Sequence, residues 1–244
     1  MLLELVLWNI ARTVKRWRWI VGLIIILVSV STVFSSATLG VYALGLVNTL
    51  TLTQVIMLFI AQREVYVRGA VHVFLRVRAR RLFWLARVLS TCVVSYGTVF
   101  LFLLGYMVII SASHGAVFPS GADPALSILN AHRIQSLSLI YNLLSLGFAS
   151  VLVLLDVVQL LLGSAFLSYV FFLAVIFLSG TSYVLPTEPL SHLVFLSSPF
   201  LRMSLFVNLH YHVSPAASLL FFFILLCLGT FIGDYLFLRK DLAQ

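Results

Sequence analysis

A run of 44 residues, from Trp19 to Gln62, contains no Asp, Glu, Lys or Arg, and seven arginines follow it between Arg63 and Arg87. As a helix with a rise of ~1.5 Å per residue, this run is roughly 66 Å long, enough to cross a hydrocarbon core of about 30 Å twice. Loops that stay in the cytoplasm are enriched in Lys and Arg. The sequence therefore predicts a polytopic membrane protein whose second span ends in a basic cytoplasmic loop.

The composition excludes an ordinary soluble domain. Hydrophobic residues make up 62% of the 244 residues and charged residues only 9%, whereas soluble domains carry about a quarter charged residues. The net charge of +8 is concentrated at the edges of apolar runs, which favours membrane lipid rather than nucleic acid as a partner. Cys92 and Cys227 lie inside apolar runs without a CxxC spacing, so we expect buried thiols and no metal site.

The lengths of the charge-free runs predict an all-α fold with six transmembrane helices in one domain, residues 19–244. Residues 1–18 precede this domain and show an amphipathic, basic pattern with tryptophans at its end, typical of a helix in the membrane interface. A plain basic flank to the first span is the alternative. The expected spans are about 19–36, 40–61, 88–112, two within 136–184 that turn near 157–163, and 216–237.

The basic residues predict the orientation of these spans. With both termini in the cytoplasm, thirteen of the fifteen Lys and Arg residues lie inside, and only Arg133 and Arg202 lie outside. Asp156 and Asp234 are the acidic residues embedded in apolar sequence. Both fall near cytoplasmic span ends, where we expect them to reach water or cap a turn. The alternative is a functional intramembrane carboxylate.

The segment 185–215 is apolar but carries four prolines, which prevent one continuous helix. We expect short re-entrant helices on the outer side, before the last span. The segment also contains a possible outer polar site, and a membrane-embedded enzyme that uses it is an alternative function. A metal is not indicated, because no third ligand is spaced to match the two nearest histidines. The site would comprise Glu188, His192, Arg202, His210 and His212.

The basic segment 62–87 is the strongest functional candidate. Its apolar residues form an approximate helical stripe with arginines beside or opposite it, which predicts a short amphipathic helix under the membrane that docks a cytoplasmic partner. The alternative is a juxtamembrane loop that binds lipid headgroups and sets the topology.

The arrangement resembles the ABC-2 type permeases, the membrane subunits of ATP-driven exporters. Glu64, Gly69 and Arg87 match the acidic residue, glycine and basic residue of that family's loop, and residues 237–242 are similar to a common family ending. The chain lacks the proline that many members have in the middle of this loop. The resemblance implies ATPase-coupling roles for Glu64, Arg68, Gly69, Arg76, Arg78, Arg80, Arg81 and Arg87.

The resemblance also implies a subunit that is not itself an enzyme. The sequence has no GxxxxGK[ST] phosphate loop, so ATP and Mg²⁺ would bind a separate cytoplasmic ATPase subunit, and the chain itself would need no cofactor. Two permeases, identical or related, would form the pathway in the plasma or inner membrane of a prokaryote. The expected cargo is hydrophobic, lipid-linked or a peptide. A non-transporting immunity or assembly protein is a further alternative.

Overall fold

Five helices are described in the computed structural model of the chain. It describes residues 2–14, 80–114, 133–164, 166–168, 170, 171, 174, 199–203, 205, 208 and 212–239. The regular structure in these ranges is entirely α-helical. The helices are α1 (Leu2–Val14), α5 (Arg80–His114), α7 (Arg133–Leu162), α10 (Pro199–Arg202) and α12 (Pro215–Arg239).

Three of these helices are long and apolar enough to cross a membrane. The qualifying stretches have 21, 29 and 25 residues and are Arg81–Leu101, Ile134–Leu162 and Pro215–Arg239. A helix of about 20 residues spans the ~30 Å hydrocarbon core. The described part is all helical, as predicted, and its three candidate spans fit a membrane-integral protein. The first and second spans, most of the fifth, and most of the expected re-entrant segment 185–215 lie outside the described residues.

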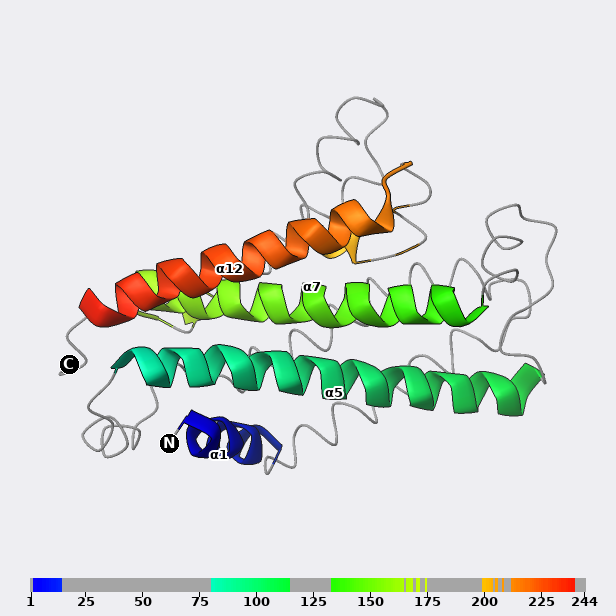
Figure 1. Cartoon of the computed structure of the whole chain (residues 1–244), viewed down its shortest axis with the longest axis horizontal. Coiled ribbons are helices and arrows are strands. Elements are labelled where there is room, and N and C mark those ends of the chain that lie inside the picture. The colour runs from blue at the N-terminus through cyan, green and yellow to red at the C-terminus, as the bar shows by residue number, and fades with distance from the viewer. Residues whose placement is uncertain are drawn as a thin grey trace.

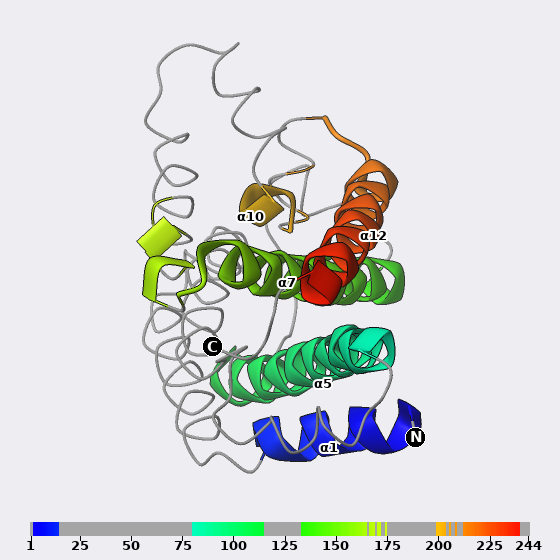
Figure 2. The ribbon, with the colours of Figure 1, turned by 90° about the vertical axis from the view of Figure 1, so that its left-hand side faces the viewer.

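The three long helices pack side by side. Helix α5 runs antiparallel to α7, and α12 runs in the same direction as α7, so that the start of α5 and the ends of α7 and α12 lie together (Figure 1). Helix α1 lies across the N-terminal part of α5 at this same end (Figure 2). The N-terminal helix and the end of the last helix are therefore on one side of the bundle.

Two of the helix ends agree closely with the sequence. Helix α7 ends at Leu162, within the predicted turn 157–163, and Gly163 follows with φ 67°. A left-handed glycine is the usual residue just past a helix end, and its N–H donates to Gln159 O at 3.0 Å. Helix α12 begins at Pro215, after Ser214, whose Oγ accepts from Ala217 N at 3.1 Å as an N-cap.

The start of α5 differs from the prediction. The third span was expected from residue 88, with residues 80–87 in the cytoplasmic loop, but α5 begins at Arg80. The arginines dominate this stretch in the sequence, whereas the side chains of Phe83, Trp84 and Ala86 between them are buried against other helices. Because these three residues are helical and buried, α5 begins about two turns before the predicted start of the span.

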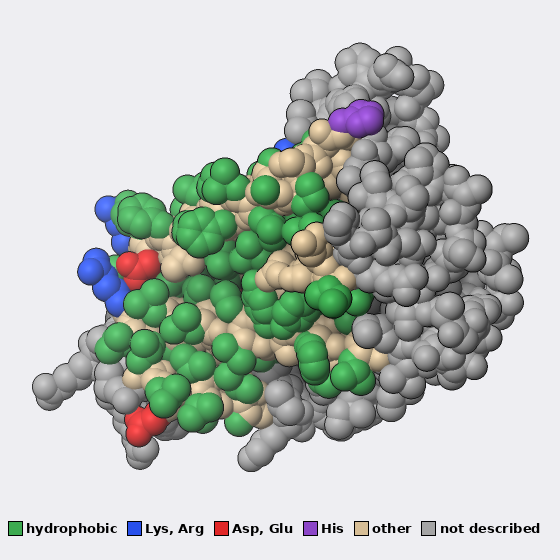
Figure 3. Space-filling view, turned by 45° about the vertical axis from the view of Figure 1, so that its right-hand side comes forward, with side chains coloured by type: hydrophobic (Ala, Val, Ile, Leu, Met, Phe, Trp, Pro, Cys, Tyr) green, Lys and Arg blue, Asp and Glu red, His purple; other side chains and the backbone are tan. Residues whose placement is uncertain are grey.

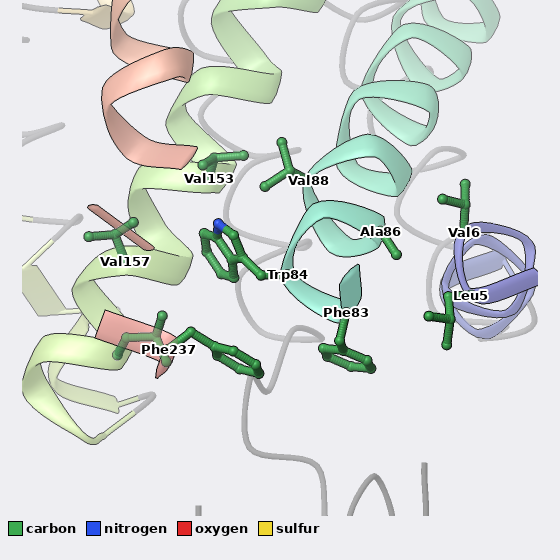
Figure 4. Close-up of a cluster of buried hydrophobic side chains, with 10 residues drawn as sticks. Leu5, Val6, Phe83, Trp84, Ala86, Val88, Val153, Val157 and Phe237 are labelled. Carbon is green, nitrogen blue, oxygen red and sulfur yellow. The ribbon is translucent and has the colours of Figure 1, made fainter. Parts of the chain in front are cut away.

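A hydrophobic cluster joins four helices at this end. Trp84 projects from α5 toward α7 and α12, while Leu5 and Val6 of α1 approach the other side of α5 (Figure 4). The Phe83 and Phe237 rings are stacked with centroids 6.0 Å apart. The cluster consists of Leu5, Val6, Phe83, Trp84, Ala86, Val88, Val153, Val157, Leu160 and Phe237.

Two glycines of α12 allow its close packing. A Cβ on Gly233 would overlap the Trp84 indole, and a Cβ on Gly229 would lie 3.0 Å from Val153 Cγ1. Glycines four residues apart let membrane helices approach closely. In this chain the glycine pair is occupied by α5 and α7 of the same molecule.

Candidate functional site: the charged end of the bundle

Charged side chains gather where α5 begins and α7 and α12 end. We call Arg81, Arg87, Asp156, Asp234 and Arg239 the charged end. Most of the visible charged side chains lie at one end of the molecule, and hydrophobic side chains cover its middle (Figure 3). This distribution is typical of a membrane helix bundle whose polar residues mark the water interface.

The most buried contact of the charged end joins α5 to α7. Arg87 Nε donates to Asp156 Oδ2 at 2.9 Å, and Arg87 Nη2 donates to Asp156 Oδ1 at 2.8 Å. The two side chains are only 10% and 1% exposed. A bidentate pair of this kind satisfies the carboxylate and fixes the orientation of both helices. The carboxylate is engaged by the guanidinium and is not available as a general base.

The environment of Asp156 therefore differs from the one predicted from the sequence. We expected it to reach water or to cap a turn, but it lies within α7 and pairs with Arg87, 69 positions earlier in the chain. The sequence contained a signal for this contact, because both residues were predicted at the cytoplasmic ends of spans. Opposite charges at the same membrane depth are candidates for pairing.

A second ion pair of the charged end is more open. Arg81 Nε lies 3.5 Å from Asp234 Oδ2, with side chains 70% and 30% exposed, so water screens this contact. Asp234 is near the cytoplasmic end predicted for the last span and is partly open to its surroundings, as expected. The Arg239 guanidinium carbon lies 4.3 Å from the centroid of the Tyr235 ring.

Trp84 connects α5 to α12 between these two ion pairs. Its Nε1 donates to Thr230 O at 2.8 Å, and its side chain is fully buried over Gly233. The indole of a buried tryptophan needs such an acceptor. The first turns of α5 are therefore attached to α7 through Arg87 and to α12 through Trp84.

The predicted coupling residues are only partly described. Glu64, Arg68, Gly69, Arg76 and Arg78 lie outside the described residues, and Arg80 is described only as the first residue of α5.

Arg81 is exposed at the charged end, where a partner can reach it. Arg87 is instead enclosed between α5 and α7. Arg81 and Arg87 were thus predicted to share one role, but they lie in different environments.

The possible outer polar site is only partly described. Glu188, His192 and His210 lie outside the described residues, whereas Arg202 and His212 lie within them. His212 is exposed and has φ 55°, a left-handed conformation that is uncommon for residues other than glycine. With only two of its five residues described, the predicted outer site stays a prediction.

Arg202 is buried on α10 beside the start of α12. Its guanidinium carbon lies 4.2 Å from the Phe221 ring centroid, and burial lowers the pKa of this guanidinium. Asn208 connects the two elements, because its Nδ2 donates to Arg202 O at 2.8 Å and its Oδ1 accepts from Ser218 Oγ. These contacts attach α10 to α12.

The described ranges do not indicate a metal site. Within them, no group of three or more His, Cys, Asp or Glu side chains lies close enough together to hold a metal ion. Cys92 on α5 and Cys227 on α12 are not joined in a disulfide, and they are half-buried and exposed, respectively, rather than buried as expected. Comparisons of the chain with protein-family models, curated proteins and solved structures found no match.

Proposed function

We propose that this chain is the membrane subunit of an ATP-driven exporter of the ABC-2 type, in which a separate cytoplasmic ATPase docks on the basic segment 62–87. One observation carries the proposal: the first turns of α5, directly after residues 62–79, are attached to two other membrane helices. A docking segment is useful for transport only if its movement reaches the spans.

The attachments of α5 support such transmission. Arg87 holds α7 through two short charge-assisted hydrogen bonds, and Trp84 holds α12 through a hydrogen bond and close packing on Gly233. Breaking a buried ion pair by removing one partner costs about 3–5 kcal/mol. The start of α5 therefore moves together with the ends of α7 and α12 rather than independently of them.

The sequence and the position of α1 support the same proposal. The sequence contains no phosphate loop, and in the proposed complex a separate subunit binds ATP and Mg²⁺. Helix α1 packs on α5 at the charged end, with Leu3 and Leu7 exposed. In the proposed complex this end faces the cytoplasm and the ATPase, both termini are cytoplasmic, and two permeases enclose a pathway for a hydrophobic, lipid-linked or peptide cargo.

The first experiment identifies the partner. The protein is purified from its native membrane in a mild detergent, and the proteins that accompany it are identified by mass spectrometry. We expect a soluble subunit with a phosphate loop in stoichiometric amount. A preparation without such a subunit, in a detergent that preserves a known ATPase complex, would contradict the proposal.

Charge reversal then tests the docking segment. Arg76→Glu with Arg78→Glu should abolish co-purification of the ATPase while the subunit still inserts into the membrane. Arg133→Glu is the control, because it reverses a charge at the start of α7, at the opposite end of that helix from the charged end. Arg81 is left unchanged, since a glutamate there would lie beside Asp234 and destabilise the bundle. Retention of the ATPase by the first variant would exclude docking through these arginines.

A further inference from the structure

Two buried serines of the long helices are distinguished from the other described residues by their hydroxyl groups. Ser95 on α5 and Ser145 on α7 are both 0% exposed, and within the described part of the chain their Oγ atoms have no donor or acceptor in reach. Four other buried hydroxyls of these helices, those of Ser90, Thr91, Thr98 and Ser150, donate to carbonyls of their own helix. Thr98 Oγ1 donates to Val94 O at 2.7 Å, and Ser150 Oγ donates to Gly147 O at 2.8 Å. Ser95 and Ser145 are therefore exceptions that need an explanation.

The two serines lie in the same layer of the α5–α7 contact. Ser95 directly precedes Tyr96, and Ser145 is one helical turn from Tyr141. The rings of these tyrosines meet edge to face with centroids 5.6 Å apart, and Tyr141 OH donates to Tyr96 O at 3.3 Å. Helix α5 therefore meets α7 at the level of both serines.

The side of α7 on which Ser145 lies is also known. Ser145 precedes Asp156 by eleven positions, which is about three turns of an α-helix. Both side chains consequently project from the same side of α7, and Asp156 on that side contacts Arg87 of α5. The Ser145 hydroxyl is thus directed toward α5.

We propose that this layer binds at least one ordered water molecule, which bridges the Ser95 and Ser145 hydroxyls inside the membrane. Buried waters typically make about three hydrogen bonds to polar groups that are otherwise unsatisfied. An unsatisfied hydroxyl is especially unfavourable here, because lipid offers no hydrogen bonds. The Arg87–Asp156 pair then holds α5 and α7 together at one end of their contact. Water occupies the layer of Ser95 and Ser145 further along the two helices. This inference does not depend on the proposed transport function.

Thiol accessibility tests whether water reaches this layer. Single cysteines replace Ser95 or Ser145 in a background carrying Cys92→Ala and Cys227→Ala, and the purified protein is treated with 2-aminoethyl methanethiosulfonate. The reagent reacts with the thiolate, which forms in a hydrated site and is suppressed in an apolar one. We expect both cysteines to react about tenfold faster or more than the control variants, since one unit of thiol pKa is a tenfold change in thiolate.

The controls are Leu144→Cys and Val99→Cys, which place a thiol at equally buried apolar positions on α7 and α5. Reaction of the serine-site cysteines no faster than these controls would overturn the proposal.

A second measurement decides the question if the cysteine variants do not fold. Removing a dry, unsatisfied hydroxyl with Ser145→Ala should leave the melting temperature unchanged or raise it. Removing a hydroxyl that binds water should lower it, by roughly 2–4 °C for a chain of this size. A lower melting temperature supports the bound water, and an unchanged or higher one overturns it.

Discussion

Arg87 and Arg202 are buried to the same extent, yet their surroundings differ. Arg87 makes a bidentate ion pair with Asp156 and joins two long helices. Arg202 places its guanidinium over the Phe221 ring and lies on a helix of four residues. Both are 9% exposed as whole residues. Burial alone therefore does not define the role of an arginine in this bundle.

The comparison separates a rigid end from a more adaptable one. A buried ion pair is directional, and removing one partner costs about 3–5 kcal/mol because the other charge is left buried. A cation–π contact contributes about 0.5–2 kcal/mol and tolerates a wider range of geometries. We therefore expect the charged end to resist rearrangement, and the contact of α10 with α12 to adjust more easily.

Asp156→Ala should have the largest effect. It leaves Arg87 buried without its carboxylate, so we expect a loss of about 3–5 kcal/mol in the free energy of unfolding. Denaturant titration in detergent measures this loss.

The matched variant replaces both partners, as Arg87→Met with Asp156→Leu. Because this change removes both charges and keeps apolar volume, stability should return close to that of the parent. If Asp156→Ala alone costs less than about 1 kcal/mol, the ion pair does not hold the two helices together.

Gly233→Ala should cause the second-largest loss of stability, because the new Cβ would overlap the Trp84 indole. Overpacking of this kind costs about 1–3 kcal/mol. Gly97→Ala is the control: it also lies within a long helix, but a Cβ there meets no atom within 4 Å. That change should stabilise α5 by about 0.5–1 kcal/mol. Equal melting temperatures for the two variants would show that Trp84 is not held closely on α12.

Arg202→Met should have a smaller effect and would sharpen the contrast with Arg87. It keeps an unbranched apolar stem and removes the guanidinium over Phe221, so we expect a loss of about 0.5–2 kcal/mol in the free energy of unfolding. A double-mutant cycle with Phe221→Leu isolates the contact energy. A coupling as large as that between Arg87 and Asp156 would remove the distinction between the two ends.

Arg81→Ala should have the smallest effect on the free energy of unfolding. The Arg81–Asp234 pair is 3.5 Å long, and the Arg81 side chain is 70% exposed, so its contribution is at most about 1 kcal/mol after screening by water. Added salt should reduce the difference in stability between Arg81→Ala and the parent protein. A larger, salt-independent loss would indicate that the pair is shielded from solvent.

The sequence correctly predicted those helix ends that depend on local signals. The last span was expected at 216–237 and is observed at Pro215–Arg239, between a Ser-Pro start and a basic end. The end of α7 fell within the expected turn because Gly163 supplies a left-handed residue. Capping residues, glycine and charge-free length act over a few positions and can be read directly.

The candidate site was less predictable because it depends on contacts between distant positions. Arg87 and Asp156 are 69 positions apart, and Trp84 donates to Thr230 at a separation of 146. Helical periodicity cannot identify such partners. Without them, a stretch with several arginines was assigned to a loop, although α5 had already begun at Arg80.

The two glycines of α12 also determine which substitutions this helix can accept. Gly229 and Gly233 face neighbouring helices, whereas Phe223, Ile224 and Phe231 are exposed. A saturation library of α12 should therefore separate into two classes of position: side chains are harmful at Gly233 and become so at Gly229 as their size grows, whereas most apolar side chains are accepted on the outer face. Since the glycine pair is already occupied within the molecule, a second membrane chain would have to recognise larger side chains elsewhere on the bundle.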